Sequence, residues 1–178
     1  MIVSDVKLQI ISTSGIRCTR NAAMIIPDIN LLLYAYDSSS PFNKKAAAWW
    51  RRSLSGTEPV GLAAVVIFGF VRIGTNPRVF QSPMTAAAAT GHVRSWLVQP
   101  VIQVLEAPAD HADHVLRLLE TLGTAGNLVT DAQIAALALD HGAAVHTADT
   151  DFMRFRGLRW FNPISGVASR RLPRTEGA

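Results

Sequence analysis

The stretch that decides the fold reads Met24-Ile-Ile-Pro-Asp-Ile-Asn-Leu-Leu-Leu-Tyr-Ala-Tyr36. It opens with an apolar run, residues 25–27, that is typical of a buried strand, and residues 30–36 start a helix. Asp28 stands between the two, and its apolar neighbours leave it badly placed for simple solvation. The pattern therefore predicts a carboxylate at the carboxyl end of a buried strand.

The rest of the chain repeats this alternation of short apolar strands and longer helical stretches. Thr85 and Asp110 are expected to cap two of the helices, and Gly56 and Gly142 to end two others. Further strands are expected at residues 60–62, 102–105, 144–147 and 158–161, and further helices from 41 to 56, 64 to 73, 85 to 97, 110 to 122 and 129 to 140. This order predicts an α/β fold with a mainly parallel central sheet covered on both faces.

Length and composition limit the class of protein. The chain has 178 residues, of which 49% are hydrophobic and 17% charged, so it suits one domain with a substantial core. The longest apolar run, residues 62–71, is about half of what a membrane span needs. The start of the chain lacks the pattern of a signal peptide, and one cysteine, Cys18, allows no internal disulfide. We therefore expect a cytoplasmic protein without a membrane segment.

The net charge of +4 comes from the two ends of the chain. Residues 1–23 and 166–178 are both net basic, whereas residues 24–165 carry equal numbers of acidic and basic side chains. We interpret 1–23 as a flexible extension, 24–165 as the folded domain and 166–178 as a basic tail. Met24 is a candidate start codon, a hypothesis that N-terminal sequencing of the native protein tests.

Four acids follow strands or begin helices of the predicted sheet. Asp28 follows the first strand, Asp149 and Asp151 follow the strand at 144–147, and Asp131 lies at the start of the helix at 129–140. In a parallel sheet these positions share one edge, so the carboxylates are expected to meet in one crevice. Their repulsion and desolvation are unfavourable without a counterion, and oxygen ligands suit Mg²⁺ or Mn²⁺.

Each acid also has a structural interpretation. Asp131 alone is equally well explained as an acid that favours a helix N-terminus, and Asp149 and Asp151 alone as turn-forming residues. The joint occurrence of four acids at the ends of successive elements favours the metal site. That site would catalyse phosphoryl transfer.

Several segments then show a specific resemblance. The chain resembles the PIN-domain ribonucleases, in particular the VapC toxins of bacterial toxin–antitoxin pairs. The matching segments are Ile26-Pro-Asp-Ile-Asn-Leu-Leu-Leu-Tyr-Ala-Tyr36, Phe70-Val-Arg-Ile-Gly-Thr-Asn-Pro-Arg-Val-Phe80, Leu128-Val-Thr-Asp-Ala-Gln-Ile-Ala-Ala136, Thr147-Ala-Asp-Thr-Asp-Phe152 and Trp160-Phe-Asn-Pro163. They occur in the expected order across residues 24–165.

The resemblance implies a PIN-like three-layer α/β/α nuclease domain at 24–165. It also implies a magnesium- or manganese-dependent endoribonuclease that forms a homodimer and is inhibited by a cognate antitoxin protein. Asp28, Asp131 and Asp149 match the metal-binding acids of the family, and Asp151 matches a less uniform fourth position. Water would attack the RNA phosphodiester in line and leave a 5′-phosphate and a 3′-hydroxyl.

The chain departs from the family pattern at one position. Many relatives carry a glutamate on the helix before the Phe-x-Arg segment, where this chain has Gly69. With one acid fewer, the site is expected to hold metal more weakly, and the glycine would permit close approach of a neighbouring element. Glu58 is a poor substitute because it precedes Pro59 at a strand entrance.

Other candidate residues lie near the acids in the implied fold. Asn30 either caps the first helix or orients Asp28, and Thr147 is a candidate for support of the site. Arg72 and Arg78 are candidates for contacts with RNA phosphates, although for Arg72 we favour an ion pair that orients an acid.

The histidines and tryptophans do not indicate chemistry. His111 and His114 share a helical face, and we expect them to titrate in solvent. Trp49, Trp50 and Trp96 are expected in the core or at a dimer contact.

Three other functions stay open at this point. The first is a metal-dependent phosphatase with an aspartate nucleophile, which the absence of a lysine near the later acids disfavours. The second is a PIN-like RNA-binding module that lost turnover, for which Gly69 is the clue. The third is a protein-interaction module built on the apolar helix at 64–73. A nuclease assay separates these from the endoribonuclease.

Overall fold

The computed structural model describes residues 24–169. The predicted extension at 1–23 and the predicted tail from residue 170 onward lie outside the described residues. In chain order the elements are β1 (Ile25–Pro27), α1 (Ile29–Tyr36), α2 (Asn43–Ser55), β2 (Val60–Ala63), α3 (Ala64–Gly74), α4 (Ala86–Leu97), β3 (Ile102–Leu105), α5 (His111–Leu122), α6 (Leu128–Asp140), β4 (Ala144–His146), the 3₁₀ helix η1 (Thr150–Arg154) and β5 (Arg159–Phe161).

The five strands form one parallel sheet in the order β3-β2-β1-β4-β5. In the register of the central pair, Ile25 lies opposite Ala144 and Pro27 opposite His146. The chain proceeds outward from β1 through β2 to β3 and then crosses to β4 on the other side of β1. The strand order therefore reverses between β1 and β4, and a crevice opens at the carboxyl ends of strands at such a point.

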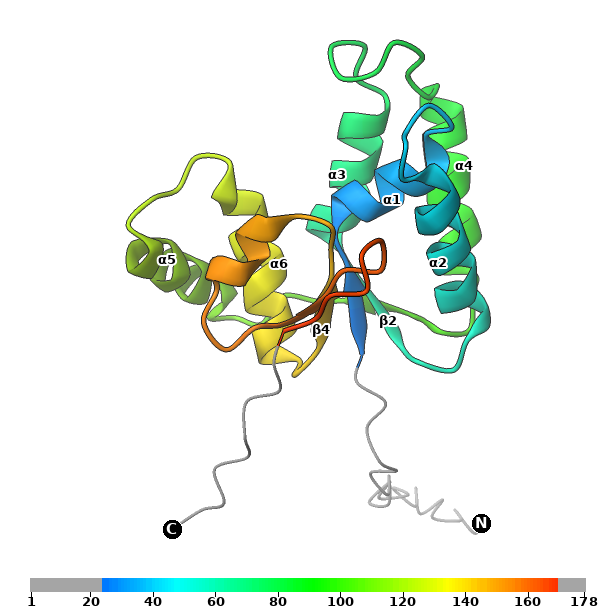
Figure 1. The fold of residues 1–178 in the computed structure, drawn as a ribbon. Coiled ribbons are helices and arrows are strands. Elements are labelled where there is room, and N and C mark those ends of the chain that lie inside the picture. Colours follow the sequence, from blue (N-terminus) through cyan, green and yellow to red (C-terminus); the bar gives the residue numbers. More distant parts are fainter. Residues whose placement is uncertain (1–23, 170–178) are drawn as a thin grey trace, which may run out of the picture.

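Helices flank the sheet in three layers. Figure 1 shows α5 and α6 on one side of the sheet and α1, α2 and α4 on the other, with α3 rising beside α1 from the carboxyl ends of the strands. One continuous core joins the layers, and its largest fully buried side chains are Trp96, Phe70 and Phe152. The predicted α/β/α architecture is confirmed.

Most of the predicted elements are present within one or two residues. Thr85 caps α4 as expected, because its hydroxyl accepts a hydrogen bond of 3.1 Å from the Ala88 N–H. Asp110 occupies the N-cap position of α5, but its side chain makes no capping hydrogen bond. The 3₁₀ helix η1 was not predicted, although Asp149 and Asp151 were interpreted as possible turn-forming residues. Asp149 is its N-cap residue, and its carboxylate accepts a hydrogen bond from the Asp151 N–H.

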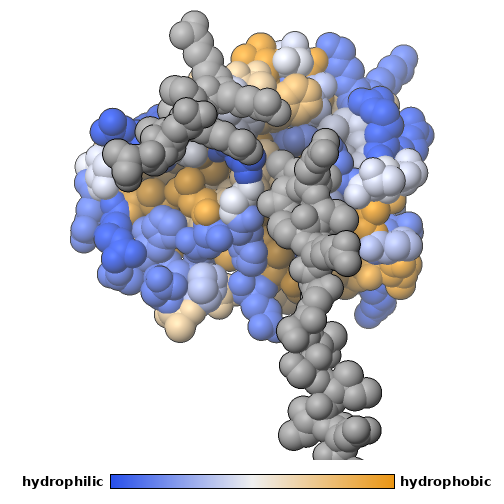
Figure 2. Space-filling view, turned by 90° about the horizontal axis from the view of Figure 1, so that it is seen from below, coloured by the Kyte–Doolittle hydropathy of each residue, from blue (hydrophilic) through white to orange (hydrophobic). Residues whose placement is uncertain are grey.

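The face at the amino ends of the strands is an ordinary mixed surface. Figure 2 shows hydrophilic side chains there with hydrophobic areas between them. Folded proteins normally expose such apolar area. None of the helices at residues 24–169 is long and apolar enough to cross a membrane.

Candidate functional site

Asp28 is a buried acid at the carboxyl ends of the parallel strands. It directly follows β1, only 2% of its surface is exposed, and its N–H donates to the His146 carbonyl of the neighbouring strand β4. Its carboxylate accepts a hydrogen bond of 2.8 Å from the Thr147 hydroxyl, which is also buried. A buried carboxylate needs such a partner, and Thr147 supplies one from the adjacent strand end.

Thr147 connects two of the acids. Besides donating to Asp28, its hydroxyl oxygen accepts from the Asp149 N–H at 2.8 Å. The Asp149 carboxylate in turn accepts from the Asp151 N–H at 2.9 Å. These hydrogen bonds fix the loop after β4 relative to β1.

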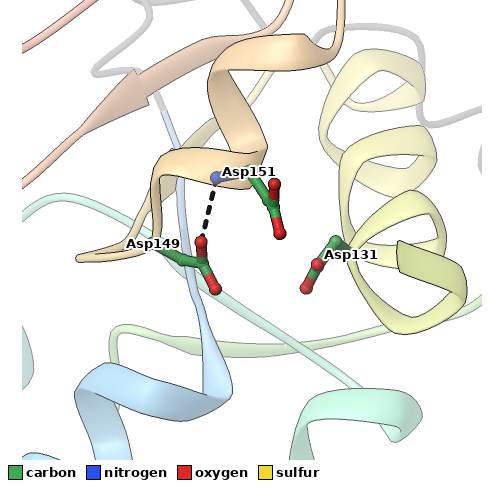
Figure 3. A group of neighbouring side chains, drawn as sticks. All are labelled: Asp131, Asp149 and Asp151. Atoms are coloured by element: carbon green, nitrogen blue, oxygen red, sulfur yellow. Dashed lines mark hydrogen bonds between the residues drawn. The ribbon is translucent and has the colours of Figure 1, made fainter. Parts of the chain in front are cut away.

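Three carboxylates converge at the carboxyl ends of the strands. Figure 3 shows Asp149 and Asp151, from the start of η1, pointing toward Asp131 in the first turn of α6. One oxygen of each can be chosen so that all three lie within 4.8 Å of one another. Asp28 is not part of this tight group, although its charge acts on Asp131 and it bonds to Thr147 beside the group.

The electrostatics of the site follow from this crowding. Burial, together with the charges of Asp28, Asp149 and Asp151, raises the pKa of Asp131 to about 7. Burial also raises the pKa of Asp28 to about 6, against the lowering effect of the Thr147 hydrogen bond. Carboxyls held this way favour either a proton or a cation, so this group of acids is suited to a metal ion with oxygen ligands.

Among residues 24–169, one basic side chain forms an ion pair with these acids. The Arg154 guanidinium lies 3.5 Å from an Asp151 oxygen, and both side chains are substantially exposed. A surface pair of this kind contributes little free energy and does not neutralise the group.

The other predicted site residues are Asn30, Arg72 and Arg78, of which the first is half-buried and the other two are exposed. Asn30 is half-buried in the first turn of α1, and its side chain makes neither predicted contact within residues 24–169. Arg72, on α3, and Arg78, in the loop after it, are exposed. The ion pair favoured for Arg72 is not found among the described residues, because no carboxylate there lies within 4.0 Å of it.

Tyr34 belongs near the site and was not singled out from the sequence. Burial and the charges of Asp28 and Asp149 raise the pKa of its hydroxyl. Tyr34 lies one helical turn after Asn30 on α1, the helix for which Asp28 is the N-cap residue. This spacing could have identified Tyr34 from the sequence.

Gly69 lies at a tight contact between α3 and α1. A β-carbon at this buried position would overlap the terminal methyl of Ile29, the residue after Asp28. The predicted close approach of a neighbouring element is therefore present, and a glutamate here would require Ile29 to move.

The prediction for His111 and His114 was wrong. Their side chains are only 15% and 24% exposed, and both face Asp140 of α6 rather than open solvent. Trp49, Trp50 and Trp96 lie in the core as predicted.

Fold and site together define a class of protein. The family model of the PIN domain matches residues 25–158, a range that contains strands β1 to β4, the helices up to η1 and the four acids. The chain belongs to this family. Within it the chain belongs to the VapC group: it is 46% identical over 141 residues to ribonuclease VapC33 of Mycobacterium tuberculosis, covering 79% of this chain and 99% of that one. Ribonuclease VapC37 of the same organism is 41% identical over 140 residues, covering 79% and 97%.

Solved structures share the fold. VapC20 of Mycobacterium tuberculosis, described as a sarcin–ricin loop cleaving toxin, superposes with a TM-score of 0.57 at 18% identity, covering 72% of this chain and 92% of its own. VapBC2 from Rickettsia felis, bound to a promoter DNA fragment, gives a TM-score of 0.56 at 16% identity, covering 78% and 98%.

Proposed function

We propose that this protein is a divalent-metal-dependent endoribonuclease and the toxin of a toxin–antitoxin pair. The observation that carries the proposal is the convergence of Asp131, Asp149 and Asp151 beside the buried Asp28. Membership of the VapC group supports RNA as the substrate, because its curated relatives are named ribonucleases.

Asp131, Asp149 and Asp151 would hold the cation, with Asp28 in support. The donors are all carboxylate oxygens, which fits a hard ion such as Mg²⁺ or Mn²⁺ rather than a soft one. When bound, such an ion would act as a Lewis acid. It would lower the pKa of a water molecule and stabilise the negative charge that develops on the phosphate oxygens.

The residues around the acids have supporting roles. The Thr147 hydroxyl forms hydrogen bonds with the Asp28 carboxylate and with the Asp149 N–H, and these bonds keep the carboxylates oriented. Arg72 and Arg78 have exposed guanidinium groups that suit bidentate contacts with RNA phosphates. These contacts would position the RNA strand for attack by water.

Two protein partners belong to the proposal. One is a cognate antitoxin, since fold relatives include VapBC complexes from Rickettsia felis and from nontypeable Haemophilus influenzae. The other is a second copy of the chain in a homodimer. Light scattering of the chain alone and with the protein encoded beside it tests both.

The function is tested by incubating purified, antitoxin-free protein with total RNA and mapping the ends. Cleavage is expected only with Mg²⁺ or Mn²⁺, and it should leave 5′-phosphate and 3′-hydroxyl ends. Asp28→Asn should abolish it while the protein stays folded, whereas Asp113→Asn, an exposed acid on α5, should not affect it.

Four results would contradict the proposal or a part of it. Cyclic phosphate ends or metal-independent cleavage would exclude the mechanism. RNA binding without cleavage in saturating Mn²⁺ would instead favour the inactive RNA-binding module. A fully active, folded Asp28→Asn variant would remove Asp28 from the mechanism.

A further inference from the structure

Phe42 is an exposed aromatic side chain at the start of α2. It is the residue before the first turn of this helix, and 41% of its surface is exposed. Its ring packs against the ring of Tyr34 on α1, with 5.2 Å between the ring centroids and 55° between the ring planes. Because Tyr34 is half-buried and part of a helix, the Phe42 ring is held by a fixed neighbour while much of it stays open.

The start of α2 lies at the carboxyl ends of the strands, where the acids are. The Lys45 amine donates a hydrogen bond of 3.0 Å to the Ile164 carbonyl, in the loop after β5. At the end of β5, the Phe161 carbonyl accepts from the N–H of Thr147, whose hydroxyl bonds to Asp28. These contacts connect the first turn of α2 with the ends of β4 and β5.

Tyr34 places the aromatic pair beside the acids from the other helix. It lies one helical turn after Asn30 on α1, the helix that follows Asp28. Burial and the charges of Asp28 and Asp149 raise the pKa of its hydroxyl, so both carboxylates are near enough to act on it. The pair of rings is therefore continuous with the site rather than on a separate face.

The side chains that follow Phe42 on α2 are basic. Lys44 and Lys45 are both exposed, and within residues 24–169 neither forms an ion pair with a carboxylate. Ammonium groups attract the phosphates of nucleic acids. An exposed aromatic ring next to basic side chains is the combination with which proteins bind single strands, since the ring stacks on a base.

We propose that Phe42, supported by Tyr34, stacks on an unpaired base beside the scissile phosphate and that Lys44 contacts a neighbouring phosphate. This inference rests on the proposed ribonuclease function and narrows its substrate class to single-stranded RNA. In a duplex the bases are paired and stacked on one another, so their faces are closed to Phe42.

RNA binding without turnover is the first test. Asp28→Asn serves as background, because it keeps the other three acids and is expected not to cleave. The probe is a short, fluorescein-labelled oligoadenylate, followed by fluorescence anisotropy in Mn²⁺. Adding Phe42→Leu, which keeps an apolar side chain without a ring, should weaken binding at least about 5-fold. Phe42→Trp should retain the affinity, and so should Leu116→Ala, an exposed apolar residue of α5.

The same strand in an RNA duplex is the second probe, and Phe42→Leu should leave its affinity unchanged. The proposal would be overturned if the background protein does not bind the single strand, or if Phe42→Leu binds it as tightly. Equal losses for single strand and duplex would also overturn it. A loss confined to antitoxin binding would assign Phe42 to a protein contact instead.

Cleavage distinguishes failure of this inference from failure of the proposed function. In the otherwise unmodified protein, Phe42→Leu should lower kcat/KM for total RNA at least about 5-fold. If the unmodified protein cleaves RNA and Phe42→Leu cleaves it equally well, only the stacking contact is wrong. If the unmodified protein does not cleave RNA in Mn²⁺, the ribonuclease function is wrong, and this inference is overturned with it.

Discussion

At the scale of single residues, the Thr147 hydroxyl is the contact on which the geometry of the acids depends. It donates to Asp28 and accepts from the Asp149 N–H, so one side chain joins the ends of β1 and β4. Because Asp28 is buried, this hydrogen bond also opposes the rise of its pKa. Thr147 therefore acts on the reaction through the acids and is a positioning residue.

Replacing Thr147 tests this role. Thr147→Val keeps the shape of the side chain and should lower RNA cleavage by about 10- to 100-fold, the usual effect of losing a partner of a metal ligand. The pKa of Asp28 should rise further, so the acid limb of the pH–activity profile should move to higher pH. Thr147→Ser should restore both. An unchanged profile in a less active Thr147→Val protein would indicate a merely structural role.

Asp131 gives a prediction about stability and pH. Its pKa in the folded protein is about 7, above the ordinary value of 3.8, so the folded state holds the proton more tightly than the unfolded state. This contribution to stability is full below about pH 4 and is lost as the pH rises through about 7. In chelator, Asp131→Asn should therefore have a Tm a few degrees above the unmodified protein at pH 8, and the difference should shrink toward pH 4.

Asp113→Asn is the matched control for this comparison. Asp113 is exposed and pairs with Arg117 on the same helix, so its replacement should give no Tm gain that grows between pH 5 and 8. Addition of Mg²⁺ at pH 8 should raise the Tm of the unmodified protein more than that of Asp131→Asn. A lower Tm for Asp131→Asn at pH 8 in chelator would contradict the account.

At the scale of elements, the contact between α1 and α3 depends on Gly69. A β-carbon there would overlap Ile29, whereas one at Gly91, on α4, would meet nothing within 4 Å. Gly69→Ala should therefore lower the free energy of unfolding by about 1–2 kcal/mol through overpacking. Gly91→Ala should raise it by about 0.5–1 kcal/mol through helix propensity. Urea unfolding measures both, and changes of the same sign would contradict this view of the contact.

The elements also show what could be predicted from the sequence. The strand at 25–27 and the helix ends at Gly56 and Gly142 are encoded locally by apolar runs and helix-stop residues, so their positions were predicted closely. The rule that parallel strands end at one edge predicted that Asp28, Asp131, Asp149 and Asp151 gather there, but the metal-binding set expected from the resemblance was Asp28, Asp131 and Asp149, whereas the tight group contains Asp151 in place of Asp28. These features need no knowledge of distant side-chain positions.

Contacts between distant residues could not be predicted in this way. The hydrogen bond from Thr147 to Asp28 joins residues that are 119 positions apart in the sequence. The contacts of His111 and His114 with Asp140 depend on how α5 packs on α6. Nothing in the local pattern around His111 indicates Asp140, which is why solvent exposure was predicted instead. Side-chain partners across elements are set by tertiary packing.

At the scale of the whole molecule, the fold brings together charges that would otherwise repel. Asp28 follows β1, Asp131 lies in the first turn of α6, and Asp149 and Asp151 follow β4, so the reversal of strand order between β1 and β4 gathers them at the carboxyl edge of the sheet. The raised pKa values of Asp28 and Asp131 reflect the burial and mutual repulsion that result. The account holds that a divalent cation offsets this unfavourable arrangement.

Calorimetric titration with Mn²⁺ at pH 7.5 measures the affinity of these acids for a divalent cation and so tests this account most directly. Asp131→Asn/Asp149→Asn is the test variant, and Asp113→Asn is the control. The unmodified protein and the control should bind Mn²⁺ alike, and the double variant at least about 10-fold more weakly. Equal Mn²⁺ affinity in all three folded proteins, or none in the unmodified one, would contradict the account.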